Sequence, residues 1–122
     1  MAIILIVEDD PLIAMTAADM IKDIGHDALE APSGERALAI LNSGEPIDLV
    51  MTDHAMPGMS GLDLAREARR LRPGIPILIA TGYPDLPEAR ALDLRCVFKP
   101  YVQEQLDAEI NELLAGASEP RA

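Results

Sequence analysis

Carboxylate side chains follow two apolar segments of this sequence, at the point where each segment ends. The segment AIILIV at 2–7 is followed by Glu8 and Asp9, and the segment ending at Thr52 is followed by Asp53. Clustered carboxylates repel one another unless a cation compensates their charge, and oxygen ligands without His or Cys suit Mg²⁺. An aspartate can also act as a nucleophile and become an aspartyl-phosphate. These residues therefore predict a Mg²⁺ site that contains a reactive carboxylate.

A hydroxyl and an ammonium group follow two later apolar segments. The segment IPILIA at 75–80 ends before Thr81, and the segment at 95–98 ends before Lys99. The lysine offers a point charge for a phosphoryl group or for Asp53, and the threonine offers a hydroxyl donor to the same oxygens. Phosphoryl transfer depends mainly on positioning and charge neutralisation, so the combined set predicts this chemistry.

Apolar segments alternate with helical patterns along the chain. Such an alternation favours a parallel β-sheet covered by helices on both faces, and right-handed crossovers make it doubly wound. Ligands of an open parallel sheet bind beyond the carboxyl ends of its strands, where the polar residues stand. The predicted strands are 2–7, 27–30, 48–52, 75–80 and 95–98, and the predicted helices are 11–24, one after Ser33, one after Ser60, a short or irregular one within 83–93, and 102–115.

The start of the helix at 11–24 has a typical capping sequence. Asp10 and Pro11 are suited to the N-cap and the first helical position, although Asp10 could instead be a metal ligand. Apolar residues at helical spacing indicate that this helix is amphipathic. These residues are Leu12, Met15, Ala18 and Ile21.

Composition limits the class of protein. The 122 residues suit one domain, which we expect over 1–116, followed by a frayed tail at 117–122. Hydrophobic residues make up 49% of the chain but aromatic residues only 2%, so the core is expected to be aliphatic. The formal net charge of −11 disfavours nucleic-acid binding, which needs clustered Lys and Arg.

The cysteine count and the N-terminal segment indicate the compartment. Cys96 is the only cysteine, which excludes an intramolecular disulfide and favours the cytoplasm. The apolar segment at 2–7 lacks a preceding basic region and is too short to span a membrane. We therefore expect a cytoplasmic protein without a membrane segment.

Four motifs together resemble one known family. VEDD at 7–10, TDHAMPG at 52–58, ATG at 80–82 and KP at 99–100 follow successive predicted strands. In this order they resemble the receiver domain of two-component response regulators, over about residues 2–115. The resemblance implies an α/β, flavodoxin-like fold with five helices and a parallel sheet of strand order 2-1-3-4-5.

The resemblance assigns roles to the residues that match the family's motifs. Asp53 matches the phosphoacceptor. Glu8 and Asp9 match the acidic pair that holds Mg²⁺, with Asp53 and the backbone carbonyl of Ala55 as further ligands. His54 follows the phosphoacceptor and is more typical of a surface or packing residue than of a catalytic one.

Further roles concern the response to phosphorylation. Thr81 matches the switch hydroxyl, Lys99 the phosphate-pairing lysine, and Pro100 a proline that usually follows a cis peptide bond in the family. Many receivers carry an aromatic residue three positions before the lysine, where this chain has Cys96. We therefore do not expect the usual rotation of that aromatic side chain.

Tyr83 suggests a different switch. The run IATGYPD at 79–85 resembles a subgroup named for a Phe-Ala-Thr-Gly-Tyr motif, the FAT GUY regulators, with Ile79 in place of the leading Phe. We hypothesise that phosphorylation draws Thr81 toward the site and shifts the loop that carries Tyr83. Ala55 has no side chain to position a hydrolytic water, so we also expect a long-lived phosphoryl group.

The predicted function is that of a stand-alone response regulator. Its partners would be a sensor histidine kinase or a histidine phosphotransfer protein as donor, and a downstream protein that contacts the face of the fourth helix, fifth strand and fifth helix. The chain is expected to be a monomer or weak dimer, and to signal rather than to act as an enzyme on other substrates.

Three alternatives compete with this function. A receiver fold could bind partners without phosphorylation, although Asp53, Thr81 and Lys99 are all present. A haloacid-dehalogenase-type phosphatase would need a second acid where Ala55 stands, and usually has a cap domain. A nucleotide-binding domain would need a Gly-rich loop after the first strand, which the sequence lacks.

Overall fold

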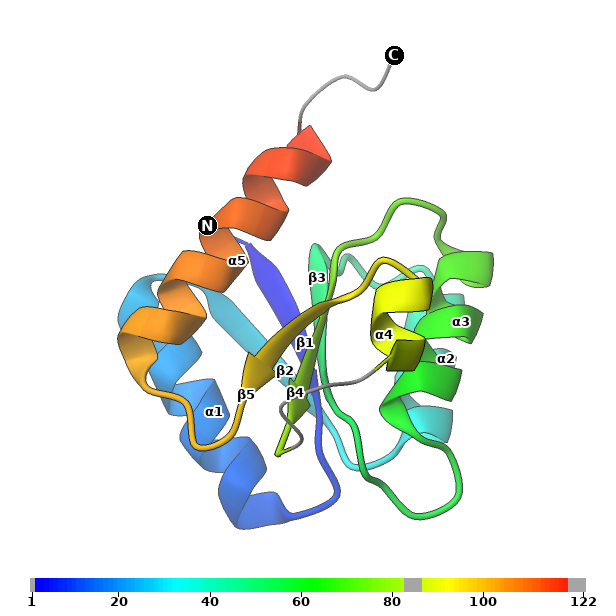
Figure 1. The fold of residues 1–122 in the computed structure, drawn as a ribbon, viewed down its shortest axis with the longest axis horizontal. Helices are drawn as coiled ribbons and strands as arrows, with labels where there is room; N and C mark the ends of the chain where they lie inside the picture. The colour runs from blue at the N-terminus through cyan, green and yellow to red at the C-terminus, as the bar shows by residue number, and fades with distance from the viewer. Residues whose placement is uncertain (1, 83–86, 119–122) are drawn as a thin grey trace.

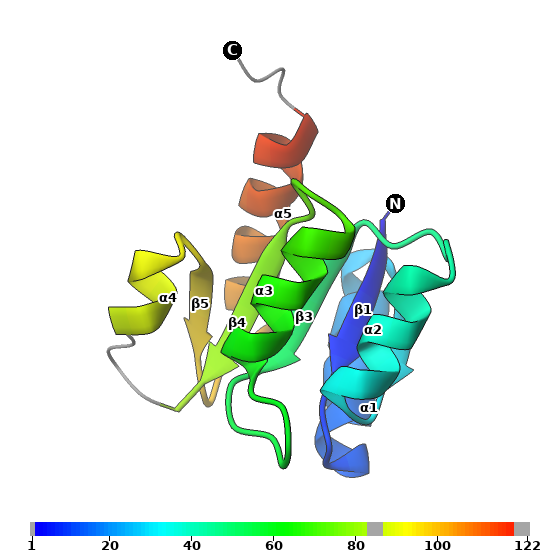
Figure 2. The same cartoon turned by 90° about the vertical axis from the view of Figure 1, so that its right-hand side faces the viewer.

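The structure is a computed structural model that describes residues 2–82 and 87–118. Five parallel strands form one sheet in the order β2-β1-β3-β4-β5. Helices α1 and α5 cover one face of the sheet and α2, α3 and α4 the other (Figure 1, Figure 2). The predicted doubly wound fold is confirmed. The strands are β1 (Ile3–Val7), β2 (Asp27–Ala31), β3 (Leu49–Asp53), β4 (Ile77–Thr81) and β5 (Arg95–Phe98).

Side-chain caps fix where the first three helices begin. The Asp10 carboxylate accepts from the backbone N–H groups of Leu12 and Ile13, and Ser33 and Ser60 cap the next two helices. These bonds satisfy backbone donors that have no partner inside the helix. The helices are α1 (Pro11–Ile24), α2 (Gly34–Asn42), α3 (Gly61–Leu71), α4 (Pro87–Ala91) and α5 (Gln103–Ser118).

The strand register brings the carboxyl ends of the central strands to one edge. Val7 pairs with Thr52 across β1 and β3, so Glu8 and Asp53 both lie one residue beyond this pair. Asp53 pairs with Ala80 across β3 and β4. Because all the strands are parallel, the segments that follow them leave the sheet at this edge.

The hydrophobic core has two halves, one on each face of the sheet. Alternate residues of a strand point to opposite faces, so Leu78 packs with α1 and α5 while Ile79 packs on the α2–α3 side. Every hydrophobic side chain that is fully buried among the described residues is aliphatic, as the composition predicts.

The buried face of α1 differs from the predicted one. Leu12 and Met15 are 66% and 51% exposed. The helix has more apolar residues than one face can hold, and the small ones face the sheet, where they allow a close approach of the helix. The residues of α1 that are buried are Ala14, Ala17, Ala18 and Ile21.

The C-terminal part of the fold follows the prediction less closely. The short α4 is confirmed, with Pro87 as its first residue. Helix α5 continues through residues 117 and 118, where we expected a frayed tail. Tyr83 and residues 119–122 lie outside the described residues, so the switch hypothesis for Tyr83 stays a prediction.

Candidate functional site

Three carboxylates meet at the carboxyl edge of the sheet. Glu8 and Asp9 follow β1, and Asp53 ends β3. One carboxylate oxygen from each of these residues lies within 4.8 Å of the others. Glu8 is buried, Asp53 is partly buried and Asp9 is exposed, so the cluster opens to solvent on one side.

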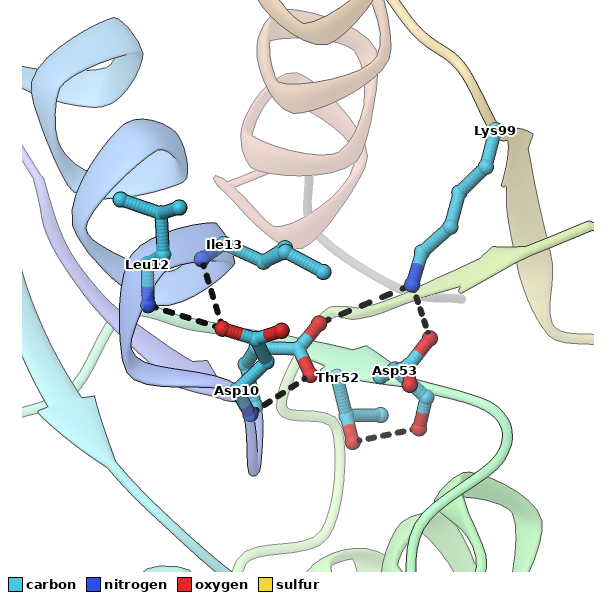
Figure 3. A network of polar contacts seen from close by, with 7 residues as sticks. Asp10, Leu12, Ile13, Thr52, Asp53 and Lys99 are labelled. Atoms are coloured by element: carbon cyan, nitrogen blue, oxygen red, sulfur yellow. Dashed lines mark hydrogen bonds and ion pairs between the residues drawn. The ribbon is translucent and has the colours of Figure 1, made fainter.

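Lys99 connects two of these carboxylates. Its Nζ lies 2.5 Å from Asp53 Oδ1 and 3.6 Å from Glu8 Oε1 (Figure 3). Burial lowers the pKa of Lys99, but the hydrogen bond and charge of Asp53, together with the charge of Glu8, outweigh burial and leave the pKa raised. The lysine therefore remains a cation at neutral pH.

Glu8 is the buried carboxylate of the cluster. Burial raises its pKa most; the backbone N–H of Asp10, which donates to Glu8 at 3.2 Å, lowers it; and the charge of Asp53 raises it again. The net pKa is raised, although Lys99 acts in the opposite direction. Ionisation of Glu8 in this site therefore costs more free energy than ionisation of an exposed glutamate.

The cluster fits a hard divalent cation. It contains three carboxylates and one ammonium group, and the described residues place no imidazole or thiol in the set. Mg²⁺ prefers oxygen ligands and commonly binds through one or two carboxylates with several waters. An added cation would also oppose the two effects that raise the pKa of Glu8, its burial and the charge of Asp53.

Asp10 takes the role of a cap rather than that of a ligand. Its Oδ1 accepts from the N–H of Leu12 at 2.9 Å and from that of Ile13 at 3.4 Å (Figure 3). Within the described part of the chain, the carboxylates that cluster do not include Asp10. The alternative that Asp10 binds metal is therefore not favoured by the geometry.

The other predicted site residues lie around the cluster. Thr81 is buried at the end of β4, and its carbonyl accepts from the N–H of Lys99 at 2.7 Å. Pro100 follows a cis peptide bond, as the resemblance implies. Ala55 is exposed in the loop after β3, two residues beyond the phosphoacceptor candidate.

Cys96 is a packing residue in this structure. It is partly buried against the core on the α2–α3 side. Burial, and then the charge of Glu109, raises the pKa of its thiol. A raised pKa disfavours the thiolate, so Cys96 lacks the property that makes a cysteine reactive.

An apolar hollow beside the cluster was not predicted from the sequence. Its volume is about 490 Å³. Tyr101, which helps to line it, is partly buried, and burial raises the pKa of its hydroxyl. The excess of apolar residues in α1 was the feature of the sequence from which such a hollow could have been predicted. The residues that line the hollow are Leu12, Ile13, Thr16, Met20, Lys99, Pro100 and Tyr101.

The raised pKa of Glu8 gives a prediction for Glu8→Gln. A raised pKa means that the folded domain binds this proton more tightly than the unfolded chain, so wild-type stability falls as the pH rises through the ordinary Glu range to the folded pKa. Without divalent cations the variant should be more stable than wild type at pH 7. The difference should shrink as the pH falls from the raised pKa of folded Glu8 toward the ordinary value of about 4.3, and should be absent below that value.

Urea denaturation in EDTA and in Mg²⁺ measures this effect. Mg²⁺ should stabilise wild type more than Glu8→Gln, because the variant has one negative charge fewer for a cation to compensate. The glutamine oxygen can still accept from the N–H of Asp10, so the loop after β1 is retained. A variant less stable than wild type in EDTA at pH 7 would contradict the prediction.

The fold and site together define a parallel α/β domain with a charged site of carboxylates and a lysine at its carboxyl edge. The family model for the response regulator receiver domain matches residues 4–111. The response regulator receiver protein CpdR of Brucella abortus is 31% identical over 120 residues, which cover 93% of this chain and 98% of CpdR. The chain belongs to the response regulator receiver domain family.

Solved structures of receiver domains have the same fold. A response regulator receiver domain protein from Clostridium thermocellum superposes with a TM-score of 0.88 at 29% identity, over 95% of this chain and 96% of that one. The receiver domain of the hybrid histidine kinase CckA superposes with a TM-score of 0.78 at 30% identity, over 92% of this chain and 98% of that one.

Several relatives are much longer than the region they share with this chain. The match spans 12% of the sensor kinase CckA of Brucella abortus, at 34% identity over 118 residues, and 26% of the transcriptional regulatory protein GlrR of Escherichia coli.

No helix in residues 2–82 or 87–118 is long and apolar enough to cross a membrane.

Proposed function

We propose that Asp53 accepts a phosphoryl group from a phosphohistidine and that the phosphorylated chain signals by protein contact. A carboxylate oxygen of Asp53 attacks the phosphorus and forms a P–O bond. The P–N bond breaks, and its electron pair returns to the imidazole, which takes up a proton and becomes a neutral histidine. The observation that carries this proposal is the contact of Lys99 with Asp53 inside the carboxylate cluster.

The same residues would hold Mg²⁺. Glu8, Asp9 and Asp53 would supply carboxylate oxygens, and Ala55 its backbone carbonyl. When bound, the cation neutralises charge on the phosphoryl oxygens. Lys99 keeps its positive charge next to Asp53, where negative charge accumulates during transfer.

We propose Thr81 and Lys99 as the residues that respond to the phosphoryl group. Thr81 at the end of β4 and Lys99 just after β5 would reach phosphoryl oxygens on Asp53. The backbones of the two residues are hydrogen-bonded to each other. A shift of this pair would alter the face of α4, β5 and α5, which we propose as the output surface. Two exposed hydrophobic side chains support this assignment: Phe98 at the end of β5 is 51% exposed, and Val102, just before α5, is 52% exposed.

Acetyl phosphate and Mg²⁺ test the proposed function directly. The intact mass of wild type should increase by one phosphoryl group, and this gain should be absent with EDTA or in Asp53→Asn. Asparagine keeps the size of the side chain but lacks the nucleophilic carboxylate. If folded wild type gains no mass from acetyl phosphate or from phosphorylated histidine donors, a phosphorylation-independent adaptor becomes the better explanation.

We propose that a cytoplasmic protein donor binds at the apolar hollow. Lys99 helps to line it, so a donor bound there would lie beside the ammonium group that contacts Asp53. Ile13 is 41% exposed and Leu12 more so. We expect the double variant Leu12→Ala/Ile13→Ala to slow transfer from a protein donor about tenfold or more. Each side chain that the bound donor buries contributes about 1–2 kcal/mol to binding.

Two comparisons make this prediction specific. Transfer from acetyl phosphate should be unchanged, because this small donor does not use the hollow. Met15→Ala is a matched control, since Met15 is also exposed on α1 but does not line the hollow. Equal losses with both kinds of donor, or an equal loss in Met15→Ala, would count against the assigned surface.

A further inference from the structure

The backbone that follows the phosphoacceptor is held from three sides. The Thr52 hydroxyl donates to the carbonyl of Asp53 at 3.1 Å (Figure 3). The N–H of His54 donates to the carbonyl of Ala80 at 2.9 Å, and the N–H of Gly61 donates to the carbonyl of His54 at 2.9 Å. Successive peptide groups after β3 are therefore fixed by the strand itself, by β4 and by the start of α3.

Gly61 lies so close to this segment that it has no space for a Cβ atom. A Cβ atom on Gly61 would lie 2.4 Å from the carbonyl oxygen of Asp53, 3.1 Å from its carbonyl carbon and 3.1 Å from the Cα of His54. All three are backbone atoms, which cannot rotate away as a side chain can. The start of α3 thus packs directly on the segment that carries Asp53, and only a glycine permits this distance.

Gly34 shows what a similar glycine does without this contact. It is the first residue of α2 and follows the capping Ser33, as Gly61 is the first residue of α3 and follows Ser60. A Cβ on Gly34 would meet the side chain of Met59, with the Sδ at 2.6 Å. The Met59 Sδ and Cγ, at 2.6 and 3.0 Å, can move by a rotamer change, and the Met59 Cβ at 3.1 Å needs only a small shift, whereas Gly61 faces a backbone oxygen at 2.4 Å.

We propose that Gly61 and Thr52 are positioning residues that set the size of the cation site. They hold the segment from Asp53 to Ala55. This segment contains the carboxylate of Asp53 and the backbone carbonyl of Ala55, both proposed above as ligands, so the inference rests on the proposed function. Mg²⁺ requires nearly octahedral ligands at about 2.0–2.1 Å, whereas Ca²⁺ accepts a looser set at about 2.3–2.6 Å. A displaced segment should therefore impair Mg²⁺ binding more than Ca²⁺ binding.

Calorimetric titration of the unphosphorylated chain with Mg²⁺ alone and with Ca²⁺ alone tests this inference. Gly61→Ala should weaken Mg²⁺ binding about tenfold or more, the range found for residues that orient metal ligands. Ca²⁺ binding should weaken less, so the ratio of the two affinities should shift toward Ca²⁺. Gly34→Ala is the matched control and should leave this ratio at the wild-type value.

Thr52→Val provides a second variant if Gly61→Ala does not fold. It removes the hydroxyl and should shift the affinity ratio in the same direction, while Thr52→Ser should restore it. Equal weakening for both cations, an unchanged ratio in both variants, or no Mg²⁺ binding by wild type would overturn the inference. Because the titration involves no phosphoryl donor, a wild type that binds Mg²⁺ but never gains a phosphoryl group would refute the proposed function alone.

Discussion

Lys99→Met is expected to slow phosphorylation of Asp53 by about 10²–10³-fold, the loss typical of removing one group that stabilises charge in a transition state. In wild type the ammonium lies 2.5 Å from Asp53 and 3.6 Å from Glu8. Methionine keeps the long apolar part of the side chain, so packing along the hollow is retained. The measurement is the rate of mass gain with acetyl phosphate at saturating Mg²⁺.

The same substitution should tighten Mg²⁺ binding. The ammonium and the metal compensate the same carboxylates, so removing one cation makes the other more favourable. Calorimetry measures this effect independently of the phosphorylation rate. Lys22→Met, at the exposed end of α1, is a control that should change neither quantity. A parallel loss of rate and of Mg²⁺ affinity would show that Lys99 acts mainly by maintaining the structure.

Leu78→Ala should lower the free energy of unfolding by about 2–5 kcal/mol, the range for deleting a large buried aliphatic side chain. Leu78 is fully buried in β4, where it packs on the α1–α5 side. A typical domain has a total stability of only about 5–15 kcal/mol, so this loss would be a large fraction of the total. Urea denaturation followed by circular dichroism gives the difference.

Leu12→Ala is the matched control for this prediction. The substitution is chemically identical, but Leu12 is 66% exposed and should change the free energy of unfolding by less than about 0.5 kcal/mol. A loss below about 1 kcal/mol for Leu78→Ala would mean that the sheet collapses around the deletion instead of leaving a cavity.

The sequence was sufficient to predict the sheet and the place where Glu8, Asp9 and Asp53 meet. Buried parallel strands leave uninterrupted apolar segments, and helix caps such as Asp10 and Ser60 have short-range signals. Once the strands are parallel, the residues that follow them must meet at one edge. The proximity of Glu8, Asp9 and Asp53 follows from this topology together with the register of β1 and β3.

Features that depend on close packing could not be predicted in this way. Several faces of α1 are apolar, and only the distance to the sheet selects Ala14 and Ala17 for burial and leaves Leu12 exposed. Gly61 has an ordinary place at the start of a helix. Its contact with the carbonyl of Asp53 depends on how α3 sits against β3, for which the sequence has no periodic signal.

The division of the core between the two faces of the sheet has a consequence for cooperativity. Each central strand contributes alternate side chains to both halves, as Leu78 and Ile79 do in β4. Neither half can lose its packing while the other remains intact, because both are built on the same strands. The helices on opposite faces are thereby linked through the sheet, and the described part of the chain should unfold as a single unit.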